Sequence, residues 1–92
     1  MEELEKFRES LNRIDGDLIR LLGERFEIIE QVGQYKRTHD IAMMQPKRVD
    51  EVKDRCAKLG ENYGLNGDFI RSLYTVIINE ACRLEDIIID ES

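Results

Sequence analysis

Four basic residues and one acid stand at positions flanked by apolar residues, and their types and spacing could bind a small anion. They are Arg8, Arg25, Lys36, Arg48 and Glu85. Arg25 and Lys36 are eleven residues apart, about three turns of a helix, so their side chains project from nearly the same side with α-carbons about 16 Å apart. Two long basic side chains that lean toward one another leave a gap suited to a small ligand.

A second basic group follows the only proline of the chain, in the segment Gln45-Pro46-Lys47-Arg48. Proline is favoured in the first turn of a helix, where its missing N–H would be unpaired in any case. Lys47 and Arg48 therefore lie at the positive end of the helix dipole, which disfavours cations and favours a bound anion. Of the two, Lys47 is the more easily explained as an exposed surface charge.

Each of these residues also has an ordinary structural explanation. Arg25 could extend its charge into water or set the register of a coiled coil, and Lys36 and Arg8 could be solvated surface charges. Lys47 and Arg48 could be an ordinary exposed pair in a loop. Glu85 could pair with nearby Arg83. The occurrence of all of them on apolar-flanked positions favours a binding site.

The element that carries Arg25 is predicted from the spacing of apolar residues, which recur at alternating steps of three and four. We call these residues the N-terminal apolar stripe; they are Leu4, Phe7, Leu11, Ile14, Leu18, Leu21, Ile28, Val32 and Tyr35. Arg25 occupies the one position of this register that is not apolar. A helix of about 30 residues spans about 50 Å, whereas a compact domain of this size has a radius of gyration of about 12 Å. The stripe therefore predicts a homodimer.

Two shorter helices are predicted after a loop. One runs from Pro46 to about Asn62 and is closed by Gly64, and the next begins at the N-cap residue Asn66. Glu85 falls on the edge of the apolar face of this last helix. We therefore expect an all-α fold with three helices, one long and two shorter, in an intertwined dimer.

Composition limits the class of protein. A chain of 92 residues forms one domain, residues 1–92, and a net charge of −6 argues against a general nucleic-acid binder. One histidine and two distant cysteines give no metal-ligand spacing, so no metal site is expected. No signal peptide or membrane-spanning run is found, which predicts a cytoplasmic protein without a membrane partner.

Several segments together resemble the all-helical chorismate mutase family over residues 4 to 89. The segments are LNRIDGDLIRLLGER, VGQYKR, QPKRV and IINEACRLED, preceded by Arg8. Members of that family are intertwined dimers of three-helix chains. The resemblance implies that Arg25 and Arg48 bind the two carboxylates of the substrate, that Arg8 arrives from the other chain, and that Lys36 donates a hydrogen bond to the ether oxygen of the breaking bond.

The resemblance also assigns Gln45, Val49 and Ala81 to substrate binding and gives Glu85 a catalytic role. The family commonly has an acid in place of Gln45, a glutamate in place of Val49 and a glutamine in place of Glu85. An ionised Glu85 would repel the ether oxygen, whereas a protonated one could donate a hydrogen bond to it, and we hypothesise that Glu85 acts protonated. The combination of segments most resembles the branch that acts on 4-amino-4-deoxychorismate.

Other activities stay open at this point. They are the rearrangement of chorismate to prephenate, the isochorismate pyruvate lyase reaction, and a non-enzymatic role as a helical dimerisation module. The family reaction is an intramolecular Claisen rearrangement, which requires no nucleophile and no cofactor. Catalysis then comes from holding the substrate in its reactive shape and from positive charge near the ether oxygen.

Overall fold

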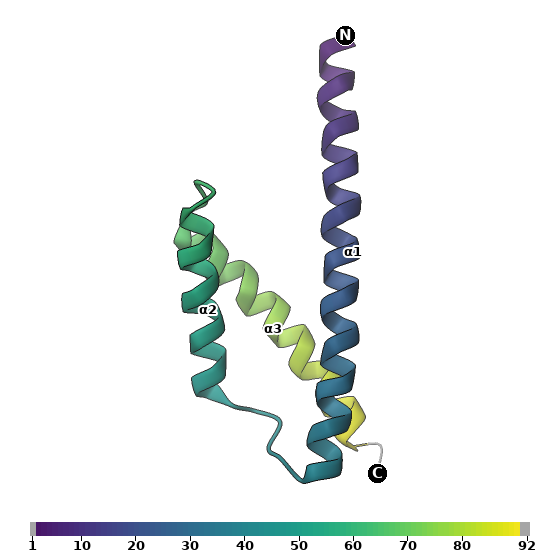
Figure 1. Ribbon diagram of the computed structural model, residues 1–92, viewed down its shortest axis with the longest axis vertical. Helices are drawn as coiled ribbons and strands as arrows, with labels where there is room; N and C mark the ends of the chain where they lie inside the picture. Colours follow the sequence, from purple (N-terminus) through teal and green to yellow (C-terminus); the bar gives the residue numbers. More distant parts are fainter. Residues whose placement is uncertain (1, 91–92) are drawn as a thin grey trace.

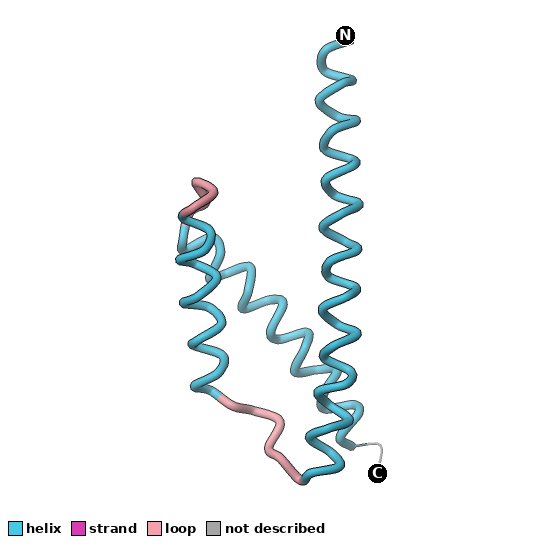
Figure 2. The backbone as a smooth tube through the Cα atoms, viewed as in Figure 1, coloured by secondary structure: helices cyan, strands magenta, loops and turns pink. Residues whose placement is uncertain are grey.

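The computed structural model describes residues 2–90, which form three helices and no strand (Figure 1). Helix α1 spans Glu2–His39, α2 spans Pro46–Glu61 and α3 spans Gly67–Asp90. In Figure 2, α1 stands as a long rod, while α2 lies beside its C-terminal half and α3 crosses from the end of α2 to the end of α1. The prediction of an all-α chain with one long and two shorter helices is confirmed.

The helix ends follow from local chemistry at the residues that the sequence indicated. Pro46 occupies the first turn of α2, and α2 ends one residue before the predicted Asn62. Gly64 has a φ of 72°, a left-handed conformation that glycine adopts without steric cost. The backbone N–H of Phe69 donates to Asn66 Oδ1 at 2.9 Å, which is the expected N-cap bond of α3.

Helix α3 holds the other two helices in position, because it packs against both of them whereas the backbones of α1 and α2 do not approach each other closely within the part of the chain described. The buried apolar residues lie on α2 and α3; they are Val52, Ala57, Ile70, Ile78 and Ala81. On α1 the buried residue is Gly33, where an added Cβ would lie 3.2 Å from Ile88 Cδ1. This glycine lets the C-terminal turns of α3 approach α1 closely, and a space opens between α1 and α2 above α3.

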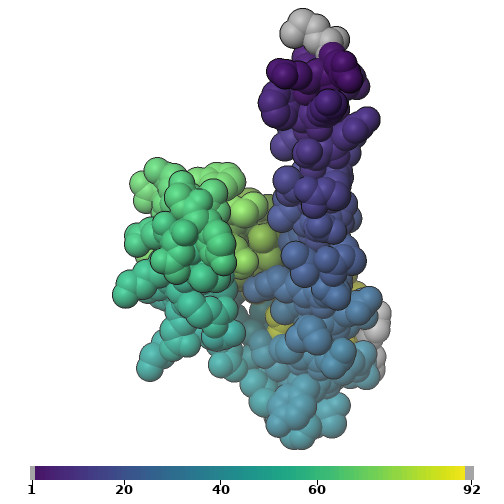
Figure 3. All heavy atoms as spheres, turned by 45° about the horizontal axis from the view of Figure 1, so that its top comes forward, coloured from purple at the N-terminus to yellow at the C-terminus, as the bar shows by residue number. Residues whose placement is uncertain are grey.

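The N-terminal half of α1 extends beyond the rest of the chain (Figure 3). The chain measures 56 Å along its longest axis and has a radius of gyration of 16.7 Å, well above the value of about 12 Å for a compact domain of this length. Phe7 is 63% exposed and Leu11 57% exposed, and the other large residues of the stripe in this half are open to solvent as well. This half of the stripe therefore has no cover within the described part of its own chain. Among the described residues, no helix is both long and apolar enough to cross a membrane.

Candidate active site

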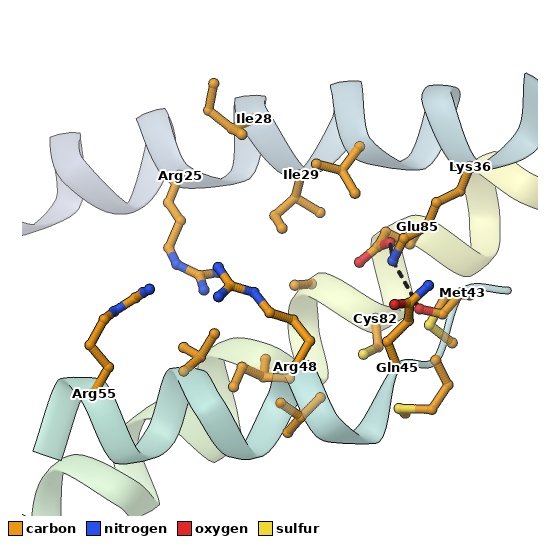
Figure 4. Close-up of a pocket in the computed structure, with 16 residues that line it drawn as sticks. Arg25, Ile28, Ile29, Lys36, Met43, Gln45, Arg48, Arg55, Cys82 and Glu85 are labelled. Atoms are coloured by element: carbon orange, nitrogen blue, oxygen red, sulfur yellow. Dashed lines mark hydrogen bonds and ion pairs between the residues drawn. The ribbon is translucent and has the colours of Figure 1, made fainter. Parts of the chain in front are cut away.

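A pocket of about 400 Å³ lies between α1 and α2, with α3 as its floor (Figure 4). Its wall combines apolar side chains with four cations and one acid. The polar and charged residues of the wall are Arg25, Lys36, Gln45, Arg48, Arg55 and Glu85. Three separate elements and the loop before α2 contribute to it, so the pocket exists only in the folded chain.

Lys36 and Glu85 form the best-defined polar contact of the pocket. Lys36 Nζ donates to Glu85 Oε1 at 2.7 Å and to the carbonyl oxygen of Met43 at 2.9 Å. Glu85 is only 5% exposed and lies one turn after buried Ala81 on α3. The alternative pairing of Glu85 with Arg83 is wrong, because Arg83 donates to Glu80 instead. A buried carboxylate and an ammonium group thus meet at one end of the pocket.

Arg25 and Arg48 extend toward one another from opposite walls, as Figure 4 shows. No acidic side chain of residues 2–90 lies within 4.0 Å of either guanidinium. Arg25 lies over the ring of Tyr74, with its guanidinium carbon 5.8 Å from the ring centre, and its Nη1 is buried without a hydrogen-bond partner among the described residues. A buried guanidinium nitrogen that lacks an acceptor, beside a second cation without an acidic partner, favours the entry of an anion.

The neutral residues assigned to substrate binding also reach this space. Gln45, Val49 and Ala81 all line the pocket. Gln45 Nε2 lies 3.4 Å from the carbonyl oxygen of Ala42, a long contact that leaves its amide available to a ligand. The end of the pocket that holds Lys36 and Glu85 therefore also offers an uncharged hydrogen-bonding group.

Arg8 is the predicted site residue that its own chain does not bring to the pocket. It lies on the exposed N-terminal part of α1, where its Nη1 donates to Glu5 Oε1 at 2.9 Å. Its α-carbon is about 25 Å along the helix from that of Arg25. The expectation that Arg8 acts in the pocket of a partner chain stays a prediction.

The sequence interpretation missed part of the wall. Arg55 and Cys82 line the pocket, although Arg55 was not singled out and Cys82 was assigned to the core. Arg55 stands seven residues after Arg48, two turns along the same face of α2, and this spacing could have revealed it. Met43 and Met44, interpreted as loop-packing residues, also contribute to the wall, whereas Lys47 does not.

Two titratable groups in or near the pocket, Cys82 and Tyr74, have a pKa above its ordinary value. Burial raises the pKa of the Cys82 thiol, and the nearby Glu85 raises it further while Lys36 opposes the change. Burial also raises the pKa of Tyr74, together with its side-chain interaction with Cys56, against the opposing charges of Arg25 and Arg55. Both cysteines are free thiols.

Fold and site together define an all-helical protein with a basic pocket between its helices, and the comparisons with known proteins identify the family. Residues 7–86 match the chorismate mutase type II family. The chain belongs to this family, and the resemblance noted in the sequence is confirmed. Within residues 2–90, no group of three or more potential metal ligands is found.

Three proteins of known name are similar to the chain over most of its length. The chain is 41% identical over 86 residues to a 4-amino-4-deoxychorismate mutase of Streptomyces venezuelae, and this match covers 94% of the chain and 84% of the relative. It is 38% identical over 85 residues to a 4-amino-4-deoxychorismate mutase of Streptomyces pristinaespiralis, covering 92% of the chain and 66% of the relative. An isochorismate pyruvate lyase of Pseudomonas aeruginosa is 30% identical over 76 residues, covering 83% of the chain and 74% of the relative.

Proposed function

We propose that this protein is a homodimeric mutase that rearranges 4-amino-4-deoxychorismate to 4-amino-4-deoxyprephenate. The proposal rests on a pocket in which Arg25 and Arg48, neither paired with an acidic side chain of residues 2–90, face each other beside the Lys36–Glu85 pair. This pocket lies in a chain whose relatives at 41% and 38% identity are named for that substrate.

The arginines hold the two carboxylates of the substrate. A guanidinium is a planar fork that binds a carboxylate through two parallel hydrogen bonds, so Arg25 and Arg48 fix the orientation of the enolpyruvyl arm and the ring. The partner's Arg8 completes the grip. Holding the arm folded over the ring converts a flexible molecule into a near-attack conformer, and this contributes to the rate without any covalent step by the protein.

Lys36 and Glu85 act at the ether oxygen, which gains negative charge as the C–O bond breaks. The Lys36 ammonium, already oriented by the carbonyl of Met43, donates to this oxygen. Losing such a preorganised donor costs on the order of 3 kcal/mol of transition-state stabilisation. Glu85 orients Lys36 through their mutual hydrogen bond and, once protonated, donates a second hydrogen bond to the substrate.

The choice of the amino substrate rests on the two named relatives. Gln45 and Val49 carry no charge, so their own chemistry offers no counter-ion for an ammonium group. The same neutral wall also accepts the hydroxyl group of chorismate. Isochorismate is the third candidate, because a lyase for that substrate is 30% identical to the chain.

A product assay tests the activity. The purified protein is incubated separately with 4-amino-4-deoxychorismate, chorismate and isochorismate, and the products are identified by mass. We expect 4-amino-4-deoxyprephenate as the main product; prephenate, or salicylate with pyruvate, would assign a different substrate. Arg48→Ala and Lys47→Ala form a matched pair, because both remove one charge from the same turn and only Arg48 lines the pocket. Only Arg48→Ala should lose turnover.

Subunit complementation tests the dimer and the partner's Arg8 together. Arg8→Ala and Arg48→Ala proteins, each inactive alone, are unfolded together and refolded as a mixture. In a symmetric dimer with shared sites, half of the mixed dimers' sites are intact, so about a quarter of wild-type activity should return. A mixture that stays inactive, or a monomer by light scattering, would refute the shared site.

A further inference from the structure

We propose that Arg55 is a further substrate-binding residue, which binds a substrate carboxylate at the end of the pocket away from Lys36. The inference rests on the proposed function and adds a residue to that site. Its basis is the position of Arg55 in the wall of the pocket, the direction of its side chain and its lack of an acidic partner among the described residues.

The position of Arg55 follows from the helical repeat. Arg48 and Arg55 are separated by seven residues, so their side chains leave α2 on the same face with α-carbons about 10 Å apart. Figure 4 shows the side chain of Arg55 directed into the same space as the ends of Arg25 and Arg48, while Lys36 and Glu85 lie at the opposite end. Three guanidinium groups from two helices therefore share one end of the pocket.

No acid of the described chain neutralises this group of cations. Glu51 and Asp54 stand four residues and one residue before Arg55, yet neither lies within 4.0 Å of its guanidinium, and Asp54 pairs with Arg71 instead. Glu85 is the one acid that lines the pocket among residues 2–90, and it pairs with Lys36. Like charges that converge without counter-ions repel one another, and a bound dianion relieves that repulsion.

The two carboxylates of the substrate have enough hydrogen-bond acceptor sites for a further arginine. A carboxylate has two oxygens and about four lone-pair sites, so each one can accept bonds from more than one guanidinium. Two carboxylates are therefore not saturated by Arg25 and Arg48. In our proposal, Arg55 donates to a carboxylate oxygen that Arg25 and Arg48 leave with free lone pairs. This contact helps to orient the substrate at a point remote from the breaking bond.

The opposing explanation is a solvated arginine on the exposed side of α2, and a matched variant separates the two. Lys58 lies one turn beyond Arg55 on the same helix, carries the same charge and does not line the pocket. Arg55→Ala and Lys58→Ala therefore remove equal charge from one helix. Arg55→Gln provides a second variant that keeps a polar side chain.

Steady-state kinetics provide the test, with thermal unfolding of each variant measured in parallel. Loss of one charge-assisted hydrogen bond at a solvent-accessible site should raise KM about tenfold in Arg55→Ala and Arg55→Gln. We expect kcat to change by less than about threefold, because Arg55 is remote from the ether oxygen. Lys58→Ala should match the wild type. Equal KM values in the Arg55 and Lys58 variants would overturn the inference.

A binding measurement distinguishes failure of this inference from failure of the proposed function. Where the protein does not turn chorismate over, calorimetric titration with chorismate measures its affinity for a cyclic dicarboxylate. If the wild type acts on none of the three candidate substrates, the proposed function fails, whereas an affinity about tenfold weaker in Arg55→Ala would still support the contact. Unchanged affinity in Arg55→Ala would refute it.

Discussion

Replacing Arg25 by leucine should stabilise the protein while removing its activity. The guanidinium of Arg25 has one buried nitrogen, Nη1, without a hydrogen-bond partner among the described residues. An unsatisfied buried donor costs about 1–3 kcal/mol, and leucine removes that cost while it restores the apolar register of α1. The lost contact with the face of Tyr74 is worth about 0.5–1 kcal/mol, so the net gain is about 1 kcal/mol.

The magnitude is large enough to measure. For a domain of this size, 1 kcal/mol corresponds to a shift of about 4–8 °C in Tm, and the comparison must be made at equal protein concentration because a dimer's Tm depends on it. Turnover should fall by about 10²–10³-fold, since a preorganised contact to a developing or bound charge is lost. Circular dichroism follows the unfolding, and a product assay follows turnover.

Arg13→Leu is the matched control for this variant. Arg13 lies on the same helix, is exposed and does not line the pocket, so this substitution should leave turnover unchanged. The reasoning would be refuted by an Arg25→Leu protein that keeps its activity. It would also be refuted by one that unfolds at a lower temperature than the wild type, because the half-buried Arg25 would then be a stabilising element of the fold.

Three other substitutions or modifications test separate parts of the structure. Glu85→Gln should keep kcat within about tenfold of the wild type, because an amide can donate the hydrogen bond assigned to a protonated carboxyl. Glu85→Ala should lower kcat by about 10²-fold, and equal losses of kcat in the two variants would exclude a donor role. The raised pKa of Cys82 keeps its thiol protonated near pH 7, so iodoacetamide should label it slowly there and faster only above the ordinary pKa of a cysteine, about 8.5. Chorismate should slow the labelling further because Cys82 lines the pocket; peptide mass measures the labelling, and rapid labelling at pH 7 would contradict this. Asn66→Ala should lower the free energy of unfolding by about 1 kcal/mol through loss of the N-cap bond, as urea titration would show, and an unchanged midpoint would refute the cap's contribution.

Local sequence patterns were sufficient to predict the helices and their ends. The three-four spacing of apolar residues predicts α1, and Pro46, Gly64 and Asn66 mark boundaries through backbone preferences that act within a few residues. The same periodicity singled out Arg25 as a cation in an apolar register. These features depend on neighbours along the chain, and the sequence determines them without reference to the tertiary fold.

Only the tertiary structure decided which faces meet. On local grounds Glu85 could have paired with Arg83, but the crossing of α3 over α1 brings it to Lys36, 49 residues away along the chain. Arg55 likewise belongs to the pocket only because α3 holds α2 opposite α1, although the backbones of α1 and α2 do not approach each other closely in the described residues. Helical periodicity determines the direction of each side chain about its own axis, whereas the packing of α3 determines what that side chain faces, because the contacts that fix the angle between helices join residues distant in sequence.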